Sequence, residues 1–212
     1  MTRSKTRWTL AGFMALGALG AVAVFDVAPA TADDAPSVVS TILDPVGDTK
    51  FNAPAFQDVV VGQMTKTANG DFHLLMEMAG PVPVNPPMPH PARSEIWWAW
   101  GFNLDPTTSP RGWPATGVGL PGEFVVIVSW DGSEFAGTAV DRRPLLTGGE
   151  AIFTPVQFSI NGAIVEAVLP YELIGDVPPS FVWDTFIWEW SAPVGRSASF
   201  HSVDVAFAIF NP

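Results

Sequence analysis

The chain has 212 residues, 21 of them acidic and 10 basic, so its formal net charge is −11 at pH 7. This excess of acid argues against nucleic acid as a partner, because phosphates attract a basic surface. The absence of cysteine excludes disulfides, thiolate nucleophiles and zinc–thiolate sites. Nine tryptophans and a hydrophobic content of 48% exclude a disordered chain, and one folded domain is the natural expectation for this length.

Residues 1–32 have the pattern of a secretory signal peptide. Three basic residues precede an apolar run over residues 8–25, and the small-residue site Ala30-Thr31-Ala32 follows it. We expect cleavage after Ala32, leaving residues 33–212 as a single domain without a transmembrane segment, secreted or held in the cell envelope. The alternative is a retained membrane anchor, because the apolar run is about as long as the shortest membrane spans, roughly 17 residues.

Alternation of apolar and polar residues predicts strands throughout the remaining chain. It is clearest in residues 72–78, 96–104, 124–130 and 203–209. In the last of these the predicted apolar face carries Val203, Val205, Phe207 and Ile209. Only one helical turn is expected, at Tyr171–Ile174 after Pro170.

Three dipeptides indicate tight hairpin turns. Asn69-Gly70, Asp131-Gly132 and Asn161-Gly162 each separate two strand-like runs, and such pairs tolerate the positive φ angles of type I′ turns. They predict three hairpins, which pair residues 58–67 with 71–79, 123–130 with 134–141, and 153–160 with 163–169. Many short strands and almost no helix predict an all-β fold, an antiparallel β-sandwich of jelly-roll-like form, with a flattened barrel as the alternative. The tryptophan-rich strands 96–104 and 181–190 are expected in its centre.

A group of aspartates early in the domain is a candidate metal site. Asp44 and Asp48 lie four residues apart around Gly47, and Asp58 follows ten residues later. Carboxylates on an irregular loop suit Ca²⁺, which takes six to eight oxygen ligands. The alternative is that Asp44 and Asp48 only accept backbone hydrogen bonds in turns.

Three tryptophans are candidates for ligand binding. Trp97 and Trp183 are expected to face away from their neighbouring tryptophans, and Trp113 lies in a loop rich in glycine and proline. Flat indole rings are good platforms for sugar rings. The competing interpretation is packing in the core, which we expect for Trp98, Trp100 and Trp130.

Acidic residues beside the aromatic residues leave an enzyme open as the alternative function. Glu95 lies near Trp97, and Asp184 and Glu189 lie near Trp183 and Trp188. Paired carboxylates are what a glycoside hydrolase needs, and an isomerase of calycin-like form is a second enzyme class. The chain lacks a Gly-x-Ser-x-Gly elbow and a His-Glu-x-x-His zinc motif, so no catalytic residue is assigned.

The order of these features resembles secreted bacterial β-sandwich modules of the DOMON and family 9 carbohydrate-binding type. The resemblance rests on Asp44-Pro45-x-Gly47-Asp48, on Asp58 opening the next strand, on the Asn69-Gly70 hairpin, on Phe102-Asn103-Leu104-Asp105, and on the proline and short turn after residues 165–169. It implies a sandwich that binds sugars or, in some members, haem, often with structural calcium. The sequence therefore predicts an exported ligand-binding or envelope-associated module that holds Ca²⁺ and binds carbohydrate or another small ligand.

Overall fold

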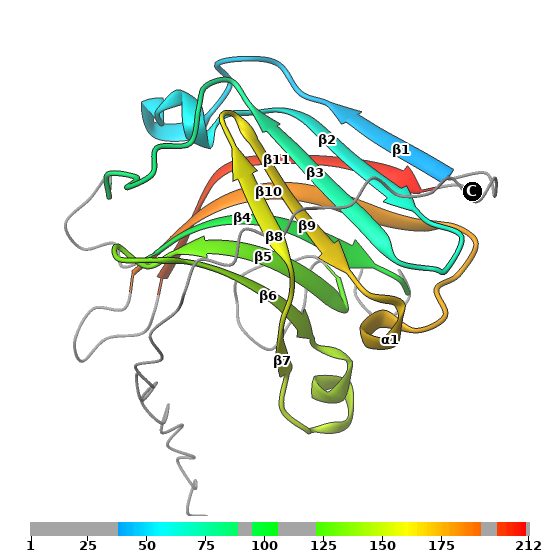
Figure 1. Cartoon of the computed structure of the whole chain (residues 1–212). Coiled ribbons are helices and arrows are strands. Elements are labelled where there is room, and N and C mark those ends of the chain that lie inside the picture. Colours follow the sequence, from blue (N-terminus) through cyan, green and yellow to red (C-terminus); the bar gives the residue numbers. More distant parts are fainter. Residues whose placement is uncertain (1–37, 89–94, 106–121, 192–198, 211–212) are drawn as a thin grey trace, which may run out of the picture. The chain divides into compact units, whose positions relative to one another are not determined.

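Two antiparallel sheets lie face to face in the computed structural model, which describes residues 38–88, 95–105, 122–191 and 199–210 (Figure 1). The five-stranded sheet has the order β1 (Val38–Leu43), β2 (Val59–Lys66), β3 (Phe72–Met78), β9 (Ile164–Leu169) and β8 (Phe158–Asn161). The six-stranded sheet has the order β11 (Ser199–Phe210), β10 (Phe181–Ser191), β4 (Glu95–Asn103), β5 (Phe124–Trp130), β6 (Phe135–Asp141) and β7 (Ile152–Pro155). The predicted all-β antiparallel sandwich is confirmed.

Helices are short and confined to connections. The described residues contain the 3₁₀ turns η1 (Lys50–Asn52), η2 (Ala55–Gln57) and η4 (Arg143–Thr147), and the predicted single turn α1 (Tyr171–Ile174) after Pro170. Within these described segments no helix has the length and hydropathy that crossing a membrane requires.

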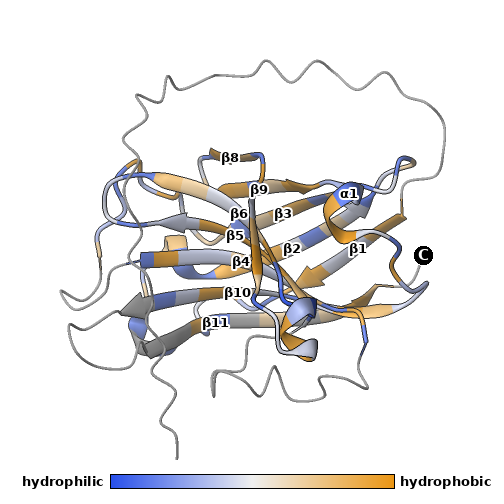
Figure 2. Ribbon diagram, turned by 90° about the horizontal axis from the view of Figure 1, so that it is seen from below, coloured by the Kyte–Doolittle hydropathy of each residue, from blue (hydrophilic) through white to orange (hydrophobic). Residues whose placement is uncertain are grey.

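The glycine turns direct the hairpins. Gly70 and Gly132 have φ angles of 94° and 93°, and each joins a pair of neighbouring antiparallel strands, β2 with β3 and β5 with β6. These two predicted hairpins are confirmed, but their turns are not of type I′, because Asn69 and Asp131 lack the positive φ that this turn type requires. Along the strands hydrophobic and hydrophilic residues alternate in short steps, as Figure 2 shows.

The third predicted hairpin is only half right. Strand β9 pairs with β8 from Phe158 onward, whereas residues 152–155 form β7 in the opposite sheet. The chain changes sheets between Val156, whose N–H donates to the Gly137 carbonyl (3.1 Å), and Gln157, whose carbonyl accepts from Val168 N–H (3.0 Å). An alternating pattern is the same in either sheet, so it cannot show this crossing.

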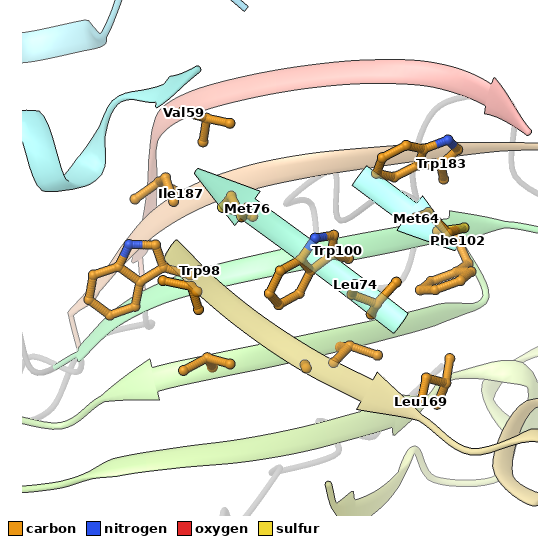
Figure 3. Packing of buried hydrophobic residues seen from close by; sticks show 14 of the residues in the cluster. Val59, Met64, Leu74, Met76, Trp98, Trp100, Phe102, Leu169, Trp183 and Ile187 are labelled. Carbon is orange, nitrogen blue, oxygen red and sulfur yellow. The ribbon is translucent and has the colours of Figure 1, made fainter. Parts of the chain in front are cut away.

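Indole rings fill the space between the sheets. Strands β4 and β10 lie in the interior of the six-stranded sheet, as predicted. Trp98 and Trp100 turn into the space between the sheets (Figure 3) and are fully buried. Their Nε1 atoms donate to the carbonyls of Phe56 (3.1 Å) and Leu75 (3.4 Å). Leu75 lies in β3 of the five-stranded sheet, and Phe56 lies in η2, just before β2 of the same sheet. These indoles therefore join the two layers through hydrogen bonds as well as packing.

The predicted apolar face of the last strand is right at Val203, which is buried in the core, and wrong at Ile209. Ile209 is 60% exposed, whereas Ala206 and Phe210 are buried in the core. The register explains the difference, because Ile187 pairs with Asp204 but Trp188 pairs with Ser202, which leaves Val203 as an extra residue. A bulge of this kind shifts the alternation by one position. Asp204 is consequently buried (6% exposed) although it was expected to face away from the core.

Hydrogen bonds hold the end of β4 close to the start of β5. The Glu123 carboxylate accepts from Leu104 N–H (2.7 Å), and the Gly122 carbonyl accepts from the buried Arg142 guanidinium (3.3 Å). Gly122 itself has a φ angle of 84°, and a Cβ at this position would lie 1.9 Å from the Phe102 carbonyl oxygen. The backbones of the two strands approach too closely there for a side chain.

Gly122→Ala should destabilise the fold far more than Gly132→Ala. Both positions have positive φ, which costs an L residue roughly 1–2 kcal/mol, but a Cβ at Gly132 meets nothing within 4 Å. The clash at Gly122 adds roughly 1–3 kcal/mol to this cost. Urea unfolding of the two variants measures the difference, and equal losses would show that the close approach is absent.

A buried carboxyl group lies in β10. Asp184 accepts a hydrogen bond from Gly101 N–H (3.0 Å) on the neighbouring strand. Burial raises its pKa from 3.8 to about 7, and the hydrogen bond lowers it only in part. Between these two values the folded protein keeps a proton that the unfolded chain has released.

We expect Asp184→Asn to gain stability relative to the wild type as the pH rises. The pKa is raised in the folded state, so stability falls as the pH rises from about 4 to about 7 and the full penalty applies above that range. Asparagine keeps the acceptor for Gly101 without the charge. Melting temperatures of both proteins between about pH 4 and pH 8 test this, since the other acids cancel in the difference; a difference that stays constant with pH contradicts it.

Candidate metal centre

The loop after β1 carries two of the predicted metal ligands. Asp44 follows the last residue of β1, and its N–H donates to the Val60 carbonyl (3.1 Å). The chain then turns through Gly47, whose φ of 85° suits glycine, and reaches Asp48. Gly47 N–H donates to Asp58 Oδ2 (2.8 Å), so the turn is held against the residue that precedes β2.

The last strand supplies the third carboxylate. The bulge in β11 places Asp204 beside the start of β2, where its Oδ2 accepts from Val59 N–H (2.7 Å). Asp44, Asp48 and Asp204 each present an oxygen within 4.8 Å of the others. Oxygens bound at about 2.4 Å on opposite sides of one Ca²⁺ are about 4.8 Å apart, so the three carboxylates fit a single ion.

Asp58 has a different place from the one predicted. It is not part of the group of three, because its Oδ2 holds the Gly47 turn, and it is 4% exposed. It lies close enough for its charge to act on Asp44. Asp58 therefore orients the loop that carries two of the three carboxylates.

The negative charges at this centre oppose one another. The pKa of Asp44 is raised from 3.8 to about 6 by burial, by the charges of Asp204 and Asp48, by a hydrogen bond with Asp204 and by the charge of Asp58. Asp44 Oδ2 and Asp58 Oδ1 are also buried without a hydrogen-bond partner. A cation would offset the repulsion and occupy oxygens that lack a donor.

Sequence reasoning missed Asp204 because the bulge is invisible in the alternating pattern. Regular alternation places Asp204 on the face opposite Val203, yet both residues are buried. One signal was present in the sequence, namely an aspartate inside an otherwise apolar strand end, Val203-Asp204-Val205-Ala206. Aspartate is depleted in strands unless it has a specific partner.

The three tryptophans proposed for ligand binding have different surroundings. Trp183 was expected to be exposed but is 1% exposed, packs in the core, and donates from Nε1 to Ser40 Oγ (2.9 Å). Trp97 is half-buried against the outer face of the six-stranded sheet, and its Nε1 donates to Glu95 Oε2 (2.5 Å). Trp113 lies outside the described residues.

The acids considered for catalysis do not form a pair. Glu189 pairs with Ile96, which belongs to the core between the sheets, whereas Glu95 is the next residue along β4. Successive residues of a strand point to opposite faces, so Glu95 and Glu189 lie on opposite sides of the sheet. Burial raises the pKa of Glu95, and the carboxylate of the buried Glu189 accepts from Gln57 Nε2 (3.1 Å). The two cannot flank one glycosidic bond as a hydrolase requires.

Comparison with known proteins identifies no relative. No protein family, no curated protein and no solved structure matches this chain. The local chemistry of the carboxylate group therefore provides the basis for a functional conclusion.

Proposed function

We propose that this protein is an exported β-sandwich binding module whose first loop and last strand hold a structural Ca²⁺. The observation that carries the proposal is the convergence of Asp44, Asp48 and Asp204, whose oxygens lie within 4.8 Å of one another. The pattern-level resemblance to DOMON and family 9 carbohydrate-binding modules supports it, because the resemblance implies a sandwich with structural calcium. Carbohydrate or another small ligand is the proposed partner of the module.

The donor set favours Ca²⁺ over other divalent cations. Carboxylate oxygens are hard ligands, and the absence of cysteine and of a described histidine in the group disfavours zinc and copper. Mg²⁺ requires near-ideal octahedral geometry and keeps several waters, whereas Ca²⁺ accepts many protein oxygens on an irregular loop. The loop between β1 and η1 is irregular in this sense.

An ion at this position would stabilise the folded chain by joining its two sheets. Asp44 and Asp48 follow the edge strand of the five-stranded sheet, and Asp204 belongs to the edge strand of the six-stranded sheet. An ion shared by these residues joins the two sheets along one edge and links segments 160 residues apart in sequence. Binding only to the folded chain, it would stabilise that chain by mass action.

Calcium should raise the melting temperature of the protein. At a hundredfold excess over its dissociation constant, a ligand adds about 2.7 kcal/mol of stability. For a domain of this size the gain corresponds to roughly 5–10 °C. Thermal melts with millimolar calcium and with chelator test the proposal, and an unchanged melting temperature refutes it.

Asp44→Asn should raise the melting temperature in chelator and reduce the further rise that calcium causes. The substitution removes a charge that Asp204 and Asp48 repel, so the chelated variant melts above the chelated wild type. It also weakens one ligand, so the increase caused by calcium shrinks or disappears. A residue with a purely structural role in a turn would lower both melts.

Asp204→Asn tests the ligand that alternation did not reveal. Asparagine retains an oxygen that accepts from Val59 N–H, so the fold is preserved while a negative ligand is lost. The exposed Glu150 provides the control, and Glu150→Gln should keep the full response to calcium. Equal responses in both variants would remove Asp204 from the site.

A further inference from the structure

The loop that carries Asp44 and Asp48 also presents two exposed apolar side chains. Leu43 is 79% exposed and Val46 is 73% exposed, and only Val84 exceeds them among the large apolar residues that the structure describes. Single exposed apolar residues are ordinary on protein surfaces. Here the two lie on either side of a proposed ligand, Asp44, because Leu43 ends β1 and Val46 lies in the turn that follows.

Backbone hydrogen bonds hold the turn on both sides of Val46. Asp44 N–H donates to the Val60 carbonyl (3.1 Å), and Gly47 N–H donates to Asp58 Oδ2 (2.8 Å). A Cβ added at Gly47 would meet nothing within 4 Å, so the space beside this residue is open. The exposed side chains of Leu43 and Val46 therefore belong to a backbone that is anchored near both of them.

A second observation indicates that the centre binds a cation. Asp58 is 4% exposed, its Oδ1 has no hydrogen-bond partner, and its charge acts on Asp44 beside it. Three monodentate carboxylates fill only three of the six to eight positions that Ca²⁺ offers. The exposed Asp48 places the ion at the surface, where an external oxygen ligand can reach it.

We propose that the calcium-loaded turn docks on an anionic lipid surface, with headgroup phosphate completing the coordination of the ion and Leu43 and Val46 entering the interface. This inference rests on the proposed calcium site. The charge of the bound cation favours an anionic partner. Without the metal, the chain has a net charge of −11 and four acids at this end, so it repels an anionic surface. A bound divalent cation reverses the interaction locally, and the adjoining apolar side chains favour a lipid interface over a fully hydrated anion.

A fluorescent dye on the turn reports directly on its contact with vesicles. Because the chain has no cysteine, a single introduced cysteine is the only site that the dye labels. Val46→Cys is labelled with an environment-sensitive fluorophore and mixed with vesicles of phosphatidylcholine and phosphatidylglycerol. We expect a blue shift only when calcium and the anionic vesicles are both present. The control carries the same label at Phe153→Cys, an exposed apolar position on β7, and its emission should not change.

Binding of unlabelled protein to the same vesicles measures the contribution of the apolar pair. Leu43→Ser with Val46→Ser should weaken calcium-dependent binding at least about tenfold, because each side chain loses its transfer out of water. The calcium-induced rise in melting temperature should stay intact in this variant, since both substituted side chains are exposed. Phe153→Ser should bind as the wild type does.

The outcomes separate the two proposals. A calcium-induced rise in melting temperature without any vesicle-dependent shift overturns the lipid inference and leaves the calcium site standing. No calcium-induced rise at all overturns both. The same shift with inorganic phosphate and calcium alone, or with uncharged phosphatidylcholine vesicles, shows that an anionic lipid surface is not the partner and overturns the inference.

Discussion

Repulsion among carboxylates at the junction of the first loop and the last strand is the constraint on which the site depends. Folding brings Asp44, Asp48 and Asp204 within 4.8 Å of one another and buries Asp58 beside them. Burial and the neighbouring negative charges raise the pKa of Asp44, and repulsion of this kind costs stability unless a proton or a cation offsets it. The proposed Ca²⁺ is the simplest group that would make the arrangement favourable at neutral pH.

The rest of the fold brings the end of β1 and the strand β11 together. Strands β1 and β11 are the edge strands of their sheets, and Trp183 Nε1 donates to Ser40 Oγ, which in turn donates to the Ile209 carbonyl (3.4 Å). These contacts draw the two edges together. The indoles of Trp98 and Trp100 hold the layers from within. In the folded sandwich the end of β1 therefore lies beside the middle of β11, which brings Asp44 and Asp48 close to Asp204.

The proposed surface role uses the same loop for a second purpose. The loop carries two of the proposed ligands and a backbone hydrogen bond to Asp58, and the side chains of Leu43 and Val46 beside Asp44 are exposed. A cation would therefore act twice, once as a link between sheets and once as a bridge to an anionic partner. Each action has its own measurement, which is why the thermal and the vesicle experiments can be separated.

Prediction from the sequence was most successful where local chemistry decides the structure. Gly70 and Gly132 accept positive φ, so the hairpins around them follow from the residues themselves. Prediction was less successful where the pairing of a strand depends on the tertiary structure. Residues 153–155 have the same alternation in either sheet, and only their backbone pairing with β6 places them in the six-stranded one.

The amino-acid sequence by itself determined the all-β class, two hairpins, the central tryptophan-rich strands and the pairing of Asp44 with Asp48, because each depends on neighbours along the chain. Only the tertiary structure decided that Asp204 completes the carboxylate group, that Asp58 holds the turn, and that Trp183 is buried. The roles of Asp204 and Trp183 depend on one extra residue in β11 and on contacts between segments more than a hundred residues apart, and the role of Asp58 depends on how the loop folds back over 11 residues. A period-two pattern carries no information about either, since it specifies which residues share a face and not which face meets which partner.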